Sequence, residues 1–336
     1  MASIRKRKWR DGKGGQRTGY IVDYTDNGGL RKRKQFSRWK MADRFRIKIV
    51  GQLSDGTYRP DAENVTVADA CNAFLGYCES RMHRNERMTR KMFVVYRGHV
   101  NNHILCNDHG IGPRKLSQFT ARSIGDFRDS LRASGVSVPT TRKILATLHA
   151  ILEYAVGQDW IAANAAHGVK VIGPRDEGSK KVSPPDRKTL MAILDAADEE
   201  FRIMLLFAAS TGVRAGEQWA LRWKDIDFDA GELRVMRRVD SYREEGPPKT
   251  AAGIRSIPLS TMLINTLREW KLKTRFKETE DLLFRNEQGR HVPHDNLAKR
   301  RFKPTLQKAG AVGTTWHSLC HSAISTWVEA GLMPKT

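Results

Sequence analysis

Residues 201–217, FRIMLLFAASTGVRAGE, join a strongly apolar run to a turn and a pair of opposite charges. The apolar run predicts a buried helix, and Gly212 permits a tight turn with a close backbone approach after it. The turn exposes Arg214 beside a buried segment, three residues before Glu217. Arg214 can therefore pair with Glu217, bind an anion, or do both. The stretch belongs to a large domain that we predict over residues 183–336.

This large domain is predicted to be mixed α and β, and mainly α. Residues 173–182 combine Gly and Pro with charged side chains, and we interpret them as a linker. Ser183 before two prolines predicts the start of a helix, with Ser183 as its N-cap. Hydrophobic periodicity predicts helices at Asp186–Ala197, Phe201–Ser210, Thr261–Lys273 and His294–Ala309, and strands at Asp225–Phe228, Glu232–Val239 and Arg255–Leu259.

Residues 65–172 predict a compact bundle of four short helices, because apolar residues recur there at helical spacing. The segment also contains four possible zinc ligands: His99, His103, Cys106 and His109. Their spacing matches no standard zinc motif. We therefore predict no metal site and no cofactor.

Residues 1–60 predict a small three-stranded sheet backed by one helix. Tyr20, Val22 and Tyr24 alternate with polar residues, which is the period of a strand. A sheet of this kind can present a basic face to a DNA groove. Basic residues available for such contacts lie in the first and last predicted strands: Arg5, Lys6, Arg7, Lys8, Arg10, Arg31, Lys32, Arg33 and Lys34.

The net charge is the strongest global signal in the sequence. Lys and Arg number 59 against 37 Asp and Glu, a formal net charge of +22. The first 60 residues hold 17 Lys and Arg against 5 Asp and Glu, so a net charge of +12 lies in that segment. A concentrated basic charge interleaved with aromatic residues favours a polyanionic partner, and double-stranded DNA is the first candidate.

Several features bound the setting in which the chain works. The four cysteines are scattered and form no disulfide framework, which indicates a reducing, cytoplasmic environment. No apolar run approaches the roughly 20 residues that a membrane span needs. The basic N-terminus is not followed by the apolar region of a secretory signal. We therefore expect no membrane partner.

Two further stretches carry residues suited to chemistry. Residues 316–322, WHSLCHS, place His317 and His321 four apart at the start of a predicted helix, so the two imidazoles share one face. Lys249 lies between two predicted strands, where it occupies an exposed hairpin tip. Taken alone, the histidines are explained as incidental and the lysine as solvated.

Together these stretches resemble the tyrosine recombinase, or phage integrase, family. The pattern is Thr-Gly-x-Arg-x-x-Glu, Leu-Arg-Trp-x-Asp-Ile-Asp at Leu221–Asp227, a hairpin Lys-Thr before Arg-Ser-Ile-Pro-Leu, and His-x-Leu-x-His. The resemblance covers nearly the whole chain. It implies an arm-type DNA-binding domain at residues 1–60, a core-binding, SAM-like helical domain at 65–172, and a catalytic domain at 183–336.

The family chemistry that the resemblance implies is site-specific cleavage and rejoining of DNA, for integration or excision. A tyrosine hydroxyl attacks a phosphodiester, forms a 3′-phosphotyrosyl bond and releases a 5′-hydroxyl, without a metal. By resemblance, Arg214 clamps the phosphoryl oxygens and Lys249 is the general acid toward the leaving oxygen. His317 assists proton transfer, and Glu217 orients the site from behind.

Two departures from the family pattern matter. Cys320 occupies the position of an expected second catalytic arginine, and a thiol supplies no positive bidentate donor. The seven tyrosines, the last of which is Tyr242, all precede His317, and none matches the place of the nucleophile. We therefore expect these 336 residues to bind DNA but to be catalytically impaired.

Alternatives remain open at this point. A truncated enzyme, a decayed remnant and a non-catalytic DNA-binding regulator all fit the two departures. A homo-tetramer on DNA, with C-terminal segments exchanged between protomers, is expected for the family, but this sequence does not contain that segment, so we do not expect the tetramer to form readily. A metal-dependent nuclease or DDE-type transposase requires clustered carboxylates around a two-metal site. Its best candidates are Asp225, Asp227 and Asp229, which fit the recombinase pattern better.

Overall fold

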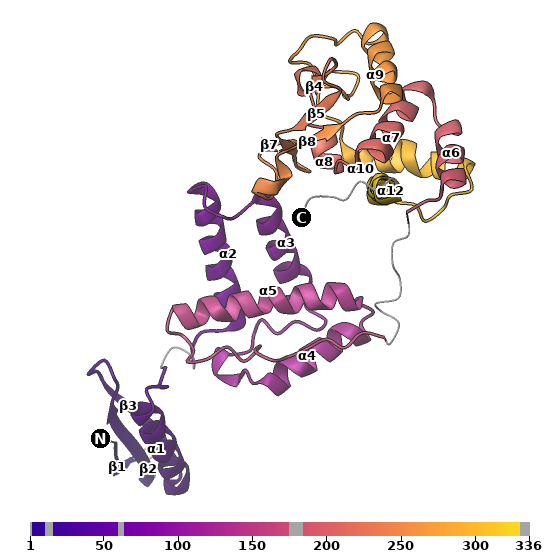
Figure 1. The fold of residues 1–336 in the computed structure, drawn as a ribbon. Coiled ribbons are helices and arrows are strands. Elements are labelled where there is room, and N and C mark those ends of the chain that lie inside the picture. Colours follow the sequence, from indigo (N-terminus) through magenta and orange to yellow (C-terminus); the bar gives the residue numbers. More distant parts are fainter. Residues whose placement is uncertain (1, 11–15, 60–63, 175–183, 330–336) are drawn as a thin grey trace. The chain divides into compact units, whose positions relative to one another are not determined.

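The computed structural model describes residues 2–10, 16–59, 64–174 and 184–329 (Figure 1). The chain divides into two compact units, Met1–Arg175 and Asp176–Thr336. The division falls within residues 173–182, which the sequence indicated as a linker. Most of that range, from 175 onward, lies outside the described residues, as does Ser183.

A three-stranded antiparallel sheet opens the first unit. Its strands are β1 (Ser3–Arg10), β2 (Gln16–Thr25) and β3 (Arg31–Phe36), with β2 in the centre. Helix α1 (Trp39–Ser54) packs on one face of the sheet. A small core forms between them from Val22, Tyr24, Ala42 and Ile49.

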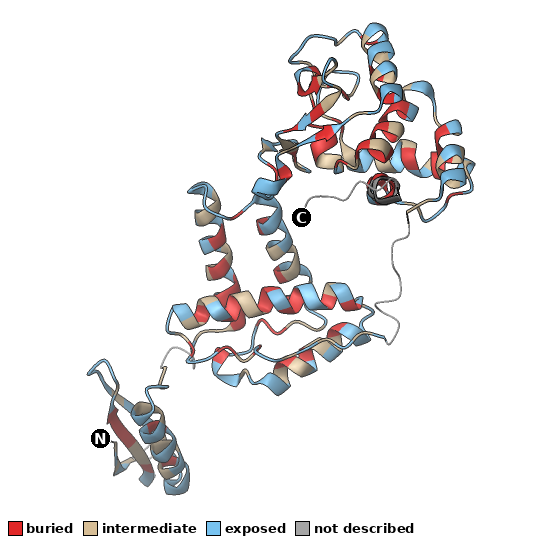
Figure 2. Ribbon diagram, in the orientation of Figure 1, coloured by how far each residue is buried: buried red, intermediate tan, exposed pale blue. Residues whose placement is uncertain are grey.

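Four helices complete the first unit: α2 (Val67–His83), α3 (Arg90–His99), α4 (Ala121–Ala133) and α5 (Val138–Gly157). A π-helical turn, Val100–Ile104, continues α3. The Thr66 side chain accepts a hydrogen bond from the Asp69 backbone N–H, and the Asp69 carboxylate accepts one from the Thr66 backbone N–H, so a capping box begins α2. Helix α5 is the centre of this bundle, since nine of its residues are buried. Red bands mark buried residues along α5 in Figure 2.

The sheet of the second unit is short. Strands β4 (Ile226–Asp227), β5 (Glu232–Val235) and β8 (Arg255–Pro258) form an antiparallel sheet in the order β4-β5-β8. A separate hairpin pairs β6 (Arg238–Val239) with β7 (Glu245–Gly246). The single strand predicted over 232–239 is therefore wrong. It breaks where the Arg237 side chain turns inward to the buried Asp225, with 2.6 Å between Nη1 and Oδ2.

Helices surround the β4-β5-β8 sheet of the second unit. The longer ones are α6 (Arg187–Asp195), α7 (Glu199–Thr211), α9 (Thr261–Lys273) and α12 (Trp316–Glu329). The shorter ones are α8 (Ala215–Gln218), α10 (His294–Leu297), a π-helical turn (Ala298–Phe302) and α11 (Lys303–Lys308). The N-cap of α6 is Asp186, whose carboxylate accepts the Thr189 backbone N–H at 2.8 Å, and not Ser183 as predicted. A carboxylate adjoining the first turn caps a helix as well as a serine does.

The core of the second unit is aromatic. Helix α12 packs against α7, and Trp316 at its start is 5% exposed. The Trp316 ring lies 5.2 Å from that of Trp219 and 5.3 Å from that of Phe302, centroid to centroid. These contacts fix the first turn of α12. The fold as a whole is mainly helical with small sheets, which confirms the predicted class.

None of the helices in the described part of the chain combines the length and the apolar composition that crossing a bilayer demands.

We predict that Trp316→Ala lowers the free energy of unfolding of the second unit by about 3–5 kcal/mol, because it empties an aromatic core position. Denaturant melts followed by circular dichroism measure the loss. The matched control is Leu272→Ala on α9, a side chain that is 84% exposed. It should change stability by less than about 0.5 kcal/mol. Equal losses in the two variants would contradict the packing described here.

Candidate functional site

The turn after α7 brings Arg214 to the surface. Helix α7 ends where the Thr211 hydroxyl donates to the Phe207 carbonyl at 2.7 Å. Gly212 then adopts a left-handed conformation with φ of +64° and reverses the chain. Arg214 follows as the N-cap residue of α8, and its side chain is 67% exposed.

Glu217 is a buried carboxylate that holds two arginines. Its Oε1 lies 3.1 Å from Nη1 of Arg214, and its Oε2 lies 2.8 Å from Nη2 of Arg255. The Oε2 atom also accepts the backbone N–H of Arg214 at 3.1 Å. Burial acts to raise the pKa of Glu217, but the hydrogen bonds from Arg255 and Arg214 outweigh it, so the pKa lies below its ordinary value. Glu217 is therefore ionised at neutral pH.

Arg255 is a site residue that the sequence analysis did not assign. It begins strand β8, and Nη1 also donates to the Gly253 carbonyl at 3.0 Å. Its side chain remains 29% exposed. The signal in the sequence was its place in Arg-Ser-Ile-Pro-Leu, but only the fold brings β8 to the buried carboxylate of Glu217. Two guanidiniums and one carboxylate leave a net charge of +1 at this point.

Cys320 is buried behind the same turn. It is 3% exposed, and its Sγ lies 2.9 Å from the carbonyl oxygen of Val213, to which the thiol donates. Burial, followed by the charge of Glu217, raises the pKa of the thiol to about 11. The neutral thiol thus ties α12 to the backbone immediately before Arg214. It supplies no positive charge to the site.

His317 and His321 form a pair on the first turns of α12. Their Nε2 atoms lie 3.1 Å apart, and the rings meet edge to face with 4.5 Å between centroids. His317 is exposed and His321 is partly exposed. In the described part of the chain, no hydrogen bond or ion pair joins His317 to Arg214.

Lys249 lies in a folded loop and not at the tip of a simple hairpin. The loop runs from β7 to β8, and a Cβ atom on Gly253 would meet the Pro248 side chain at 2.4 Å. This close approach turns the loop back on itself and leaves Lys249 exposed. No ion pair of Lys249 occurs within the described ranges. The structure therefore brings Arg214, Glu217 and Cys320 together, but does not join Lys249 to them.

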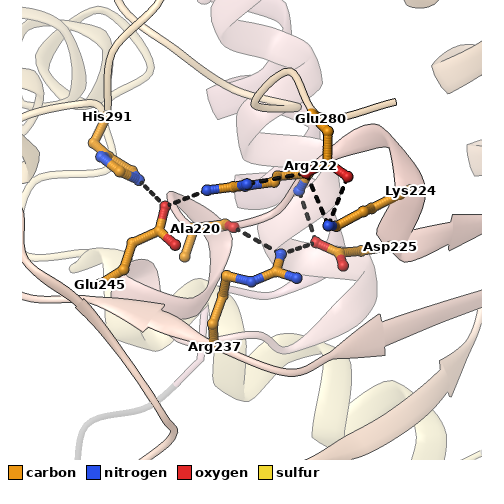
Figure 3. Close-up of polar contacts among 8 residues, drawn as sticks. All are labelled: Ala220, Arg222, Lys224, Asp225, Arg237, Glu245, Glu280 and His291. Atoms are coloured by element: carbon orange, nitrogen blue, oxygen red, sulfur yellow. Dashed lines mark hydrogen bonds and ion pairs between the residues drawn. The ribbon is translucent and has the colours of Figure 1, made fainter. Parts of the chain in front are cut away.

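A network of charges anchors the strand that leads into this loop (Figure 3). Arg222 bridges Glu245 on β7 at 2.9 Å and Glu280 at 3.1 Å, and Lys224 also contacts Glu280 at 2.7 Å. His291 lies 2.9 Å from the same oxygen of Glu245. Burial acts to raise the pKa of Glu245, but the hydrogen bonds and charges of Arg222 and His291 together outweigh it, so the pKa lies below its ordinary value.

Asp225 belongs to the same network and has a structural role. It is 5% exposed, accepts the backbone N–H of Arg222 at 2.8 Å and pairs with Arg237. Asp227 binds the backbone N–H groups of Asp229 and Ala230. Within the described residues these aspartates form no group able to hold a metal ion. This arrangement does not support the metal-dependent nuclease.

The N-terminal sheet sorts its basic residues by face. The register pairs Lys34 with the buried Val22 and Lys32 with Tyr24, so these lysines share the face that α1 covers. Lys34 Nζ accordingly lies 4.6 Å from the ring centroid of Phe45 on α1. The full division follows from alternation along the strands, with Lys6, Lys8, Lys32 and Lys34 on the α1 side and Arg5, Arg7, Arg31 and Arg33 on the open side. The Arg10 side chain lies outside the described residues.

The open face is preorganised by one carboxylate. Asp23 in the central strand is 8% exposed and binds Arg31 through two hydrogen bonds of 2.8 and 2.6 Å. Arg33 lies 3.3 Å from the same carboxylate. The hydrogen bond from Arg31 lowers the pKa of Asp23 and keeps it ionised. Trp9 crosses the same face over Gly19, where a Cβ atom would lie 3.0 Å from the indole ring.

Comparison with protein families matches residues 181–336 to the model described as the phage integrase family. One relative is the tyrosine recombinase XerC-like protein of Caldanaerobacter subterraneus, 27% identical over 97% of this chain and 88% of its own length. Another is the ICEBs1 integrase of Bacillus subtilis, 26% identical over 90% of this chain and 82% of its own.

Solved structures of integrases share the fold. The Tn1549 transposon integrase in complex with a circular intermediate DNA matches with a TM-score of 0.63 at 17% identity, over 79% of this chain and 88% of that one. A lambda integrase tetramer bound to a Holliday junction matches with a TM-score of 0.58 at 16% identity, over 95% and 90%.

We predict that Cys320 resists alkylation in the native protein. With a pKa of about 11, about one thiol in a thousand is ionised at pH 8, and the thiolate is the reactive form. Iodoacetamide labelling followed by peptide mass spectrometry measures the rate at each cysteine. Cys106, which is partly exposed, is the matched control and should react first. Comparable rates at Cys320 and Cys106 before unfolding would contradict the buried thiol.

Proposed function

We propose, from the premise that the chain belongs to the tyrosine recombinase (phage integrase) family, that it binds double-stranded DNA at a specific site. Its lineage is that of enzymes that cleave and rejoin DNA through a 3′-phosphotyrosyl intermediate, in integration or excision. The observation that carries the proposal is the pair of guanidiniums on Glu217. DNA bound to the Tn1549 and lambda integrases is consistent with it.

In this proposal the scissile phosphate lies against Arg214 and Arg255. A guanidinium donates two parallel charge-assisted hydrogen bonds to phosphoryl oxygens. Glu217 binds one nitrogen of each guanidinium and so fixes the plane of both side chains before DNA arrives. Less side-chain entropy is then lost when DNA binds. Because the Arg214 side chain is largely exposed, the N–H groups that do not bind Glu217 can reach a phosphate. Glu217 is then a positioning residue and does not touch the reacting atoms.

Cys320 explains the impairment that we propose for catalysis. The neutral thiol donates its hydrogen bond to the Val213 carbonyl, so it donates none to the phosphate. Loss of one donor to a developing oxyanion typically costs on the order of 10²–10³ in rate. Arg255 supplies charge for binding the phosphate, but Glu217 and the Gly253 carbonyl already occupy some of its donors.

The remaining roles follow the family pattern. Lys249 is proposed as the general acid toward the leaving 5′-oxygen, and its exposed loop allows its ammonium to approach DNA. His317 is proposed to donate to, or exchange a proton with, a phosphoryl oxygen. The anchoring of β7 by Arg222 and His291 supports the first role, because it fixes the strand that leads to Lys249.

The arginines on the open face of the N-terminal sheet are proposed to contact DNA. Arg5, Arg7, Arg31 and Arg33 point away from α1, and Asp23 holds the last two in place. The lysines on the α1 side, together with Arg10, are proposed to add phosphate contacts at the edges of the sheet. Division of the chain into an arm domain, a core-binding domain and a catalytic domain remains part of the proposal, as does a homo-tetramer on DNA.

The second candidate function is a non-catalytic DNA-binding regulator or decayed recombinase. Cys320 favours it, because the substitution removes a catalytic charge and leaves the fold around it intact. Both candidates bind DNA, and they differ in whether a covalent protein–DNA adduct forms slowly, as in an impaired recombinase, or not at all, as in a regulator.

We predict that Arg5→Ala/Arg7→Ala weakens DNA binding through lost phosphate contacts. The slope of log K against log salt should fall by up to about 2, roughly 0.9 for each phosphate contact removed. Fluorescence anisotropy with a random-sequence duplex at several salt concentrations measures the slope. The matched control is Lys6→Ala/Lys8→Ala in the same strand but on the other face, which should change the slope less. A larger effect in the lysine variant would reverse the assignment of the DNA-contacting face.

We predict that the full chain enriches a defined sequence from a pool of random duplexes. A nicked suicide duplex carrying that sequence should yield no covalent adduct on denaturing gels during an ordinary incubation, because the site lacks one transition-state donor. Failure to enrich any sequence argues against site-specific binding. A rapidly formed adduct argues against impairment and leaves the family assignment untouched.

Substitution of the two arginines tests the proposed phosphate site through the affinity for the same duplex. Arg214→Ala and Arg255→Ala should each weaken binding about tenfold, equivalent to about 1.4 kcal/mol. The control is Arg202→Ala, an exposed arginine that pairs with Asp195 on the same unit and should have a smaller effect. Unchanged affinity in Arg255→Ala would remove Arg255 from the proposed phosphate site.

A further inference from the structure

Two imidazoles and a carboxylate converge on the surface of the helical bundle of the first unit. His149 and Glu153 lie four residues apart on α5, and therefore on one face of that helix. His167 reaches them from the turn that follows Trp160. One donor atom from each residue lies within 4.8 Å of the other two, and the described ranges contain this one group of the kind.

The distances between donor atoms are those of ligands around one small cation. Nε2 of His167 lies 3.0 Å from Oε1 of Glu153, and Nε2 of His149 lies 3.8 Å from that oxygen. Nε2 of His149 also lies 3.5 Å from Nδ1 of His167, the other nitrogen of that ring, and a single ion would take only one of the two His167 nitrogens. Tetrahedral zinc with bonds of about 2.0–2.1 Å holds neighbouring ligand atoms about 3.4 Å apart. Small side-chain adjustments would therefore bring all three donors to such an ion.

A buried asparagine builds this arrangement from behind. Asn164 is 6% exposed, and its Nδ2 donates to Oε1 of Glu153 at 2.7 Å and to the carbonyl of His149 at 3.0 Å. Its Oδ1 accepts the backbone N–H of Ala166 at 2.9 Å, which shapes the turn that carries His167. Metal ligands in proteins are commonly oriented by hydrogen bonds of this type.

We propose that His149, Glu153 and His167 bind a divalent transition metal ion, with zinc as the best match. Two imidazoles and one carboxylate form a donor set that zinc accepts, with a fourth position left for water. The ion would join α5 to the turn at residues 164–168, near the end of the first unit. An ion pair between exposed groups contributes little to stability, whereas a bound ion would cross-link two segments. The proposal is independent of the metal-free DNA chemistry proposed above.

No sequence pattern indicates this site. His149 and Glu153 have helical spacing, but His167 is distant along the chain and the pattern matches no standard motif. The ligands considered from sequence, His99, His103, Cys106 and His109, do not form a metal-capable group in the described residues. His317 and His321 offer two close nitrogens on α12, and they serve as an internal comparison.

Titration of the chelator-treated full chain with Zn²⁺, by calorimetry and against a competing chromophoric chelator, tests the proposal. The wild type should bind one tight equivalent. His149→Ala, Glu153→Gln and His167→Ala should each weaken that equivalent by at least about tenfold. His321→Ala should retain it. Co²⁺ in place of Zn²⁺ should give the visible absorption of a tetrahedral site in the wild type and not in His167→Ala.

The His167 variant is the decisive one, because its side chain is 70% exposed and its removal should leave the fold unchanged. Circular dichroism confirms folding, and Zn²⁺ should raise the melting temperature of the wild type but not of His167→Ala. Absence of a tight equivalent in the wild type overturns the proposal. So does a tight equivalent that persists in His167→Ala.

Discussion

The carboxylate of Glu217 is the constraint on which the candidate site depends. It is buried, ionised and bound by two guanidiniums from separate elements, Arg214 at the start of α8 and Arg255 at the start of β8. An ionised group in such a place is stable only when it is paired. The pairing therefore joins the helical and sheet parts of the second unit at the point where positive charge reaches the surface. The same carboxylate limits the net charge, so the two arginines can lie close together without DNA.

Cys320 acts on this arrangement through the backbone. Its thiol donates to Val213, one residue before Arg214, and links α12 to the turn formed by Gly212. Position 320 thus contributes to the shape of the site while contributing no charge to it. Shape and charge are separable here because the turn is held by several independent contacts, among them the Thr211 hydroxyl and the Glu217 carboxylate.

Local sequence patterns predicted most helices and strands well. They did not predict the features that depend on contacts between residues distant in the sequence. The apolar periods gave the mainly helical class and α9 with its observed ends. Periodicity could not foresee the break at Arg237, because it depends on a buried carboxylate twelve residues earlier. Sequence analysis missed Arg255 for the same reason, and also the group at His149, Glu153 and His167. In both cases residues distant in the sequence become neighbours only in the folded chain. Arg214 and Glu217 were found because their pairing is local, three residues apart.

The sorting of arginines and lysines onto opposite faces of the N-terminal sheet has a consequence for chemical modification. Lysine acetylation removes a positive charge, while arginine cannot be neutralised in this way. Acetylation of Lys6, Lys8, Lys32 or Lys34 would lower the charge on the α1 side alone. The open face, with Arg31 held by Asp23, would keep its charge unchanged. An enzyme that modifies lysines could thus weaken the edges of this surface without altering its centre.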